Sequence, residues 1–216
     1  MTYLFDDIAN FTDENYFTML NAVSGGRAEK SLRYRYMADK KTSLIAYLLL
    51  LYGLRNEFGA DTQPEFSVGK FGKPYIPGSR ISFNMSHTRK GVMCSIFQNR
   101  VGCDIESEIR KPVEAPSVFC RNEISLIRRQ ERLFTKLWTL KEAYAKCMGF
   151  GLTENLTVID FTEFVLKEKF ETNGKQFLSR HRGDLYYSVC IDGRQEDIQN
   201  VRFLKSEELL EMKGRI

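Results

Sequence analysis

The chain has 216 residues, of which 43% are hydrophobic and 28% are charged, and its formal net charge at pH 7 is +4. A chain of this length and composition can bury a full hydrophobic core, which excludes an intrinsically disordered protein. The mild positive charge suits an anionic ligand or an acidic partner protein, but it is too small to indicate a nucleic-acid-binding protein by itself.

Cysteine and histidine usage narrows the function classes further. The five cysteines form no CxxC pair, and their odd number would leave one thiol outside any disulfide scheme. Because no cationic and apolar leader opens the chain, we expect a cytoplasmic protein in a reducing compartment. Two histidines disfavour a His-rich zinc site, and the most apolar run, residues 44–52, is too short to span a bilayer.

Helical patterns are predicted in the first 59 residues. Residues 12–23 open with Thr12-Asp13-Glu14, which is typical of a helix start, and residues 42–58 carry a buried apolar stripe that ends at Gly59. A basic segment lies between them, and it is either a solvated helix face or a surface that binds a polyanion. Its cations are Arg27, Lys30, Arg33, Arg35, Lys40 and Lys41.

Strand patterns follow. Three short runs, at residues 81–85, 92–97 and 101–105, alternate or are apolar enough to form strands. Gln98-Asn99-Arg100 reads as a tight reversal, so the last two runs are predicted to form a hairpin.

The second half repeats this order of elements. Two prolines within residues 111–116 indicate a linker, which divides the chain into halves of residues 1–110 and 111–216. Helices are predicted from about residue 122 and over residues 133–148, and a short helix from Ser206. Four strand-like runs are expected to form an antiparallel meander: residues 161–170, 176–178, 186–190 and 201–204. The pattern predicts an α+β fold with two similar halves, each with helices packed on a small, mostly antiparallel sheet.

Two acids share one face of the strand at residues 101–105. Asp104 and Glu106 alternate with the apolar Cys103 and Ile105, and Gly102 leaves room beside them. Such a pair can be the wet face of an exposed strand, or half of a site for a hard divalent cation.

A third acid lies on the predicted helix over residues 133–148. Glu142 and Lys146 are four residues apart on one face, which is also the spacing of an ordinary surface ion pair. Lys141 and Lys146 flank the acid, as expected if phosphate oxygens approach while carboxylates hold Mg²⁺. Trp138 and Ala143 mark a packed face that would hold Glu142 rigidly.

Further polar residues suit an anion. Ser86 and His87 are adjacent, so they are a poor nucleophile–base pair, and an anion site made by the hydroxyl, the ring and loop N–H groups fits better. Lys73 lies in a rigid turn beside Pro74, where it contacts either a phosphate or nothing.

These motifs together resemble those of the surfactin-synthetase type of 4′-phosphopantetheinyl transferase. They occur in the same order over about residues 24 to 152, whereas residues 153–216 match only in general character. The motifs are Gly72-Lys73-Pro74, Phe83-Asn84-Met85-Ser86-His87, Val101-Gly102-Cys103-Asp104-Ile105-Glu106, Trp138-Thr139-Leu140-Lys141-Glu142-Ala143 with Lys146, and Gly149-Phe150-Gly151-Leu152. The resemblance implies a fold of two pseudo-symmetric α+β halves, for which a monomer suffices.

The resemblance also assigns roles to residues. Asp104, Glu106 and Glu142 would bind Mg²⁺, and Glu142 and Lys146 would be catalytic. The contacts with coenzyme A would come from Arg27, Lys30, Lys41, Lys73, Ser86, His87, Lys141 and Lys146. The family commonly has Arg directly before the Ser-Leu of its apolar helix; here Thr42 occupies that position, and Lys41 is the neighbouring cation.

The implied reaction moves 4′-phosphopantetheine from coenzyme A onto a serine of an apo acyl or peptidyl carrier protein and releases 3′,5′-ADP, in non-ribosomal peptide or polyketide biosynthesis. The serine proton would go to Glu142 directly or through a metal-bound water. The alternatives are a Mg²⁺-dependent phosphohydrolase acting on coenzyme A or a related nucleotide, and a polyanion-binding module. Neither nucleic acid nor a membrane is an expected partner of the transferase.

Overall fold

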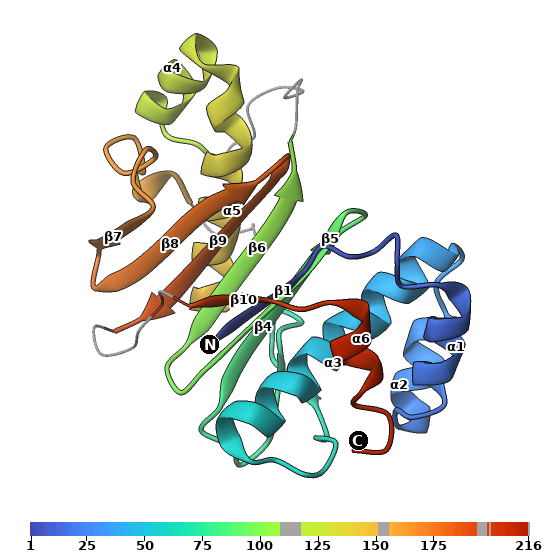
Figure 1. Ribbon diagram of the computed structural model, residues 1–216. Coiled ribbons are helices and arrows are strands. Elements are labelled where there is room, and N and C mark those ends of the chain that lie inside the picture. The colour runs from blue at the N-terminus through green and yellow to red at the C-terminus, as the bar shows by residue number, and fades with distance from the viewer. Residues whose placement is uncertain (109–117, 151–155, 194–197, 199, 216) are drawn as a thin grey trace.

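The computed structural model describes residues 1–108, 118–150, 156–193, 198 and 200–215. Two four-stranded sheets and six α-helices form an α+β fold, which confirms the predicted fold class. Figure 1 shows the two sheets side by side, with α5 behind one of them and α3 packed on the other. In the described part of the chain, no helix combines the length and the apolar character needed to cross a membrane.

The first sheet has the order β10-β1-β5-β4. Its strands are β1 (Thr2–Phe5), β4 (Ser82–Thr88), β5 (Gly91–Phe97) and β10 (Val201–Phe203). It is covered by α1 (Asp13–Leu20), α2 (Gly25–Leu32), α3 (Met37–Phe58) and the short α6 (Ser206–Leu210). The apolar stripe of α3 is buried against this sheet, and Gly59 ends the helix in the left-handed conformation with φ 65°.

The second sheet has the order β6-β9-β8-β7. Its strands are β6 (Val101–Ser107), β7 (Lys169–Thr172), β8 (Lys175–Arg182) and β9 (Leu185–Asp192). The helices α4 (Arg121–Arg129) and α5 (Phe134–Met148) belong to this half, with two 3₁₀ turns, η1 (Glu131–Leu133) and η2 (Leu156–Val158). A two-stranded ribbon, β2 (Ser67–Val68) with β3 (Pro74–Tyr75), lies outside both sheets.

The predicted hairpin over residues 92–97 and 101–105 is wrong. Both edges of β5 are taken, by β1 and by β4, so β6 turns away at Gln98-Asn99-Arg100 and pairs with β9 instead. Side chains, rather than a backbone ladder, join the two sheets at this point. The Asn84 Oδ1 of β4 accepts a hydrogen bond of 2.8 Å from the Cys103 N–H of β6. We call this junction of β4 with β6 the seam.

The predicted meander is confirmed only for β7, β8 and β9, which pair antiparallel. Residues 162–166 form turns and not a strand, because Phe161 and Val165 are buried in a one-turn loop closed by the Val165 N–H. The last strand, β10, leaves the meander and pairs parallel with β1 in the first sheet.

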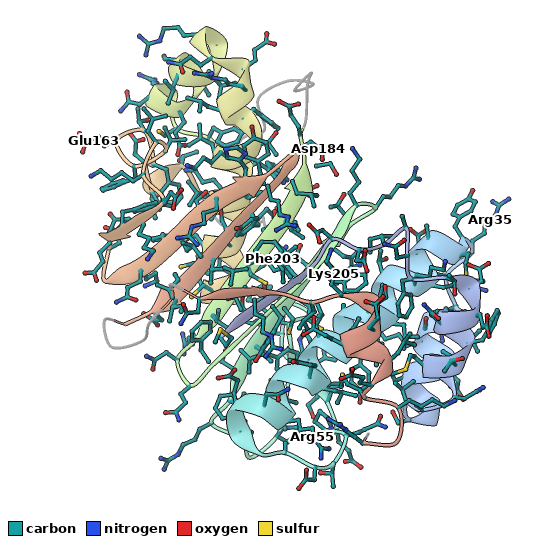
Figure 2. All side chains as sticks on the ribbon, in the orientation of Figure 1. Arg35, Arg55, Glu163, Asp184, Phe203 and Lys205 are labelled. Carbon is teal, nitrogen blue, oxygen red and sulfur yellow. The ribbon has the colours of Figure 1, made fainter. Side chains whose placement is uncertain are left out.

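The sheets do not divide the chain into consecutive halves, because β6 lies in the second sheet and β10 in the first. The predicted linker at residues 111–116, and with it the boundary at 110/111, lies outside the described residues. Apolar side chains from both sheets fill the space between them. Phe203 of β10 lies in this space, as Figure 2 shows, and its ring contacts Tyr187 and the guanidinium of Arg182.

Candidate functional site

A glycine lets α5 lie directly on the seam. A Cβ atom at Gly102 would stand 2.1 Å from the carbonyl oxygen of Ala143 and 2.2 Å from the amide nitrogen of Cys147, both in the backbone of α5. No side chain fits in that space, so glycine at this position allows strand and helix to touch. The close approach brings the last turns of α5 beside the acids of β6.

Lys146 of α5, Asp104 of β6 and Ser86 of β4 meet at this junction. The Oδ1 of Asp104 accepts hydrogen bonds from the Ser86 hydroxyl (2.8 Å) and from the Lys146 ammonium (2.5 Å). The same ammonium lies 3.2 Å from the Ser86 hydroxyl and 3.8 Å from Glu142 Oε2. Residues from three elements, predicted separately from the sequence, therefore come together at one point.

Burial and neighbouring carboxylates raise the pKa of Glu106 and of Glu142. Burial, followed by the charges of Asp104 and Glu142, raises the pKa of Glu106 to about 7. Burial also raises the pKa of Glu142, with Asp104 adding to the shift and Lys146 opposing it. Burial works against the charge of Lys146, but the Asp104 carboxylate outweighs it and raises the pKa of this lysine. The site thus contains three acidic side chains but only one ammonium, that of Lys146, which does not balance their negative charge.

The donor set fits a divalent cation. Asp104 is 2% exposed, and its Oδ2 is buried without a hydrogen-bond partner, an arrangement that costs free energy unless a cation or a proton occupies the position. Carboxylate oxygens are the ligands that Mg²⁺ prefers. The three acids are not preassembled, however. Among the described residues, the three possible ligands whose atoms lie within 4.8 Å of one another belong to a different group: Cys120, Glu123 and Asp160.

Two of the predicted lysines are engaged elsewhere. The ammonium of Lys141 is fully buried and bonded to the Glu123 carboxylate at 2.8 Å, which contradicts the predicted contact with a coenzyme A phosphate. The ammonium of Lys73 donates to the carbonyl oxygens of Val101 and Lys146, each at 2.7 Å, and so clamps β6 to the end of α5. Burial lowers the pKa of Lys73. Both lysines therefore bond to protein groups around the site and hold its elements in place.

A second group of cations lines a pocket of about 610 Å³ between α2, α3 and the β2–β3 ribbon. Arg27 and Lys30 supply its charge, and Tyr47, Phe66 and Met85 are among its apolar walls. The Arg27 guanidinium lies 5.1 Å from the centre of the Tyr47 ring, and its Nη2 donates to the hydroxyl of Ser43 at 2.9 Å. Burial lowers the pKa of Arg27, and its Nε has no hydrogen-bond partner, so an anion here would satisfy a buried donor.

His87 follows Ser86 on β4, and its side chain is exposed. Desolvation by the surrounding protein lowers its pKa, Asp39 opposes this shift, and the charges of Lys146 and Arg27 lower the pKa further. Lys41, in contrast, forms an ion pair of 2.7 Å with Asp13.

The sequence patterns gave no role to three residues that shape the site. Asn84 fixes the seam through Cys103, and Tyr47 and Phe66 form aromatic walls of the pocket. A polar residue inside the strand pattern of residues 81–85 was the available signal for Asn84. Tyr47 reads as one more member of the apolar stripe of α3, so no local pattern could single it out.

Comparisons with known proteins agree with this geometry. A family model described as the 4′-phosphopantetheinyl transferase superfamily matches residues 100–196. The chain is 28% identical to the 4′-phosphopantetheinyl transferase Sfp of Bacillus subtilis (strain 168), over 88% of the chain and 91% of that protein. It is 32% identical to the 4′-phosphopantetheinyl transferase gsp of Aneurinibacillus migulanus, over 69% and 66%.

A further 4′-phosphopantetheinyl transferase of Bacillus subtilis is 30% identical over 62% of the chain and 64% of its own length. The chain therefore spans slightly less than two thirds of several curated relatives that it matches. The alignment with Sfp is more extended than these two, since it covers 88% of the chain.

Proposed function

Since the chain belongs to the 4′-phosphopantetheinyl transferase superfamily, we propose that it moves the 4′-phosphopantetheine group of coenzyme A onto a serine of an apo acyl or peptidyl carrier protein. The observation that carries this proposal is the cluster of Ser86, Asp104 and Lys146 at the seam, in which the Oδ2 of Asp104 is buried without a hydrogen-bond partner. A divalent cation would supply the positive charge that this cluster lacks and would itself attract the pyrophosphate of coenzyme A.

Asp104, Glu106 and Glu142 would hold Mg²⁺, which when bound neutralises charge on the pyrophosphate as a Lewis acid. Two features of the chain support this assignment. The Oδ2 of Asp104 is buried without a partner, and burial, followed by the charges of Asp104 and Glu142, raises the pKa of Glu106 to about 7. Both conditions are relieved when a divalent cation enters.

The cations of the chain divide between the two ends of the substrate. Lys146 lies at the acids, where a fixed ammonium stabilises the negative charge that builds on the transferred phosphate and on the leaving group. Arg27 and Lys30 line the pocket and would take the remaining phosphate, and His87, beside Ser86 on β4, would contact the same substrate. Lys41 is already paired with Asp13, so it contributes less.

The chemical step needs a proton acceptor. The serine hydroxyl of the carrier gives its proton to Glu142, whose raised pKa favours this role near neutral pH. The serine oxygen then forms a bond to the phosphorus on the pantetheine side, and the bond from that phosphorus to the bridging oxygen breaks. The products are the holo carrier and 3′,5′-ADP. An acidic carrier surface would suit the net charge of +4.

The test is to incubate the pure protein with coenzyme A, Mg²⁺ and an apo carrier and to record intact-mass spectra of the carrier. We expect a phosphopantetheine adduct that depends on Mg²⁺ and is lost with Glu142→Ala. Consumption of coenzyme A without any adduct would instead establish a phosphohydrolase. The matched control is Glu168→Ala, because Glu168 pairs with Arg180 on the far side of the second sheet.

If neither product forms, but the protein binds nucleic acid in a salt-dependent manner that is indifferent to Glu142→Ala, the polyanion-binding reading replaces the transferase. The carrier panel should include acyl and peptidyl carriers, because the seam itself contains no feature that separates them.

A further inference from the structure

Helix α5 carries two lysines, and only one of them belongs to the seam. Lys141 precedes Glu142 by one residue, so its side chain leaves the helix about 100° away from that acid. Its side chain and that of Glu123 on α4 are both fully buried, with the ammonium 2.8 Å from Glu123 Oε2. A lysine enclosed in this way has no route to a bound phosphate.

The hydrogen bonding of this pair is complete. The Lys141 ammonium has three donors, and they go to Glu123, to the Leu156 carbonyl at 2.8 Å and to the Ile159 carbonyl. Glu123 in turn accepts the Cys120 N–H at 2.9 Å and the Phe161 N–H at 3.0 Å. The ring of Phe161 lies 5.5 Å from the ammonium.

The network therefore joins three segments to α5. They are the start of α4, the η2 turn and the loop at Phe161, and each is bonded to the Lys141 side chain directly or through Glu123. The strand β6 touches α5 elsewhere, at Gly102. Figure 1 shows α5 between α4 and the second sheet. Helix α5 is thus held by hydrogen bonds at Lys141 on one side and by close backbone packing against Gly102 on another.

Hydrogen bonds constrain the position of a helix more tightly than apolar packing does. A buried ion pair adds little net stability compared with apolar residues of the same volume, because both charges lose their hydration. It does fix the rotation and the height of a helix, since each bond tolerates only a narrow range of distance and angle. Rotation and height of α5 decide where Glu142 and Lys146 point.

From this geometry we infer that Lys141 and Glu123 are a positioning pair: they hold α5 so that Glu142 and Lys146 face Asp104, and Lys141 itself never touches the substrate. This inference rests on the proposed function, because the residues that it positions are those of the proposed transfer site. It also gives a role to a lysine that the sequence placed on a phosphate.

The test uses the double variant Lys141→Met/Glu123→Gln, which removes both charges while the amide keeps hydrogen-bonding capacity toward its neighbours. Lys136→Met is the matched control, since Lys136 lies on the same helix and bonds only to the Lys167 carbonyl in the described structure. Lys146→Met is the comparison for a lysine that does contact phosphate. Each variant is assayed for kcat, for the Kd of coenzyme A and for the unfolding temperature.

For the double variant we expect a kcat that falls about 10-fold to 100-fold, because a displacement near 1 Å at a reacting group has an effect of that size. The Kd for coenzyme A should stay within about threefold of the wild type, whereas Lys146→Met should weaken it about 10-fold or more. Lys136→Met should change neither.

Two results overturn the inference. One is a kcat of the double variant within about threefold of the wild type, and the other is a loss of coenzyme A affinity that equals the loss in Lys146→Met. If the double variant does not fold, Glu123→Gln alone weakens the pair while Lys141 is kept, and the same two criteria apply to it.

Hydrogen exchange separates a failure of this inference from a failure of the proposed function, since it needs no activity. In the folded double variant the amides of Glu142 to Lys146 should exchange faster than in Lys136→Met. Unchanged exchange there overturns the positioning role, whatever reaction the wild type catalyses.

Discussion

Helix α5 carries two lysines, five residues apart, and each pairs with a carboxylate from another element. The two pairs differ in how many of their hydrogen-bonding groups have a partner. In the pair of Lys141 with Glu123 both side chains are fully buried, and every donor of the ammonium has an acceptor. In the pair of Lys146 with Asp104 the lysine side chain is 29% exposed, and one carboxylate oxygen has no partner. A saturated pair can only hold the fold together, whereas an unsaturated one can still accept a ligand.

The strongest contrast is expected in the free energy of unfolding. Lys141→Met leaves the Glu123 charge buried without its partner, which should lower the free energy of unfolding by about 3–5 kcal/mol. Lys146→Met also leaves a buried carboxylate, Asp104, without its partner, but the Lys146 side chain is 29% exposed and water can reach the vacated position, so the loss should be smaller, about 1–3 kcal/mol. Denaturant unfolding of both variants measures the difference. Equal losses would remove the distinction between the two pairs.

Asp104→Asn should produce the largest change in activity. The substitution keeps the shape of the side chain but removes the charge that faces Lys146 and the proposed cation, so transfer should fall on the order of 10³-fold. A discontinuous assay that follows the holo carrier by mass spectrometry measures this loss. Asp192→Asn is the matched control, because Asp192 pairs with Lys175 away from the seam. Near-normal transfer by Asp104→Asn in Mg²⁺ would contradict the assignment.

Gly102→Ala tests the close contact of β6 with α5, which brings Asp104 beside Lys146. The added methyl would stand 2.1 Å from the Ala143 carbonyl, so β6 and α5 must separate. Overpacking of this kind should lower the free energy of unfolding by about 1–3 kcal/mol and should reduce transfer as well. Thermal unfolding and the carrier assay measure the two effects. Gly183→Ala, in a turn with φ 59°, is a control that adds local strain but no contact with α5.

The smallest effect is a pH dependence that belongs to the unsaturated site alone. The pKa of Glu106 is about 7 in the folded protein against an ordinary 4.5, so the folded state prefers the protonated carboxyl. The associated stability is complete below pH 4.5 and is lost as the pH rises through about 7. Without Mg²⁺, Glu106→Gln should therefore raise the unfolding temperature by a few degrees at pH 8 and by less at pH 5.

The same pH series has an internal control. Glu123→Gln should show no such difference between pH 5 and pH 8, because Glu123 is bonded to Lys141 and is not one of the acids of the seam. Added Mg²⁺ should erase the difference between wild type and Glu106→Gln at pH 8. If Glu106→Gln raised the unfolding temperature more at pH 5 than at pH 8, the raised pKa of Glu106 at the seam would be contradicted.

Local patterns were enough to select residues that the structure brings to the seam. The alternation of acids with apolar residues in β6 identified Asp104 and Glu106, and the helical spacing of four identified Glu142 with Lys146. The same patterns failed for Lys141, because its burial depends on α4 and η2, which approach α5 from other parts of the chain. A lysine one residue from Glu142 looks the same in sequence whether it faces solvent or core.

Strand partners were the other limit. The reversal at Gln98-Asn99-Arg100 is short enough for a hairpin, and only the pairing of β5 with β1 shows why none forms. The strand β1 has four residues and no turn signal beside it, so the sequence did not reveal it. Pairing between residues that are 199 positions apart, such as Thr2 and Val201, leaves no local trace.

That pairing has a consequence for the order of events during synthesis. The strand β1 is made long before β10, so the first sheet cannot close until residues 201–203 have left the ribosome. Until then β1 presents an open edge beside β5, ready to pair with any other extended chain. Such a sheet should fold late and slowly, because its last contact closes a loop of nearly the whole chain. We therefore expect the nascent chain to depend on chaperones until the first sheet has closed.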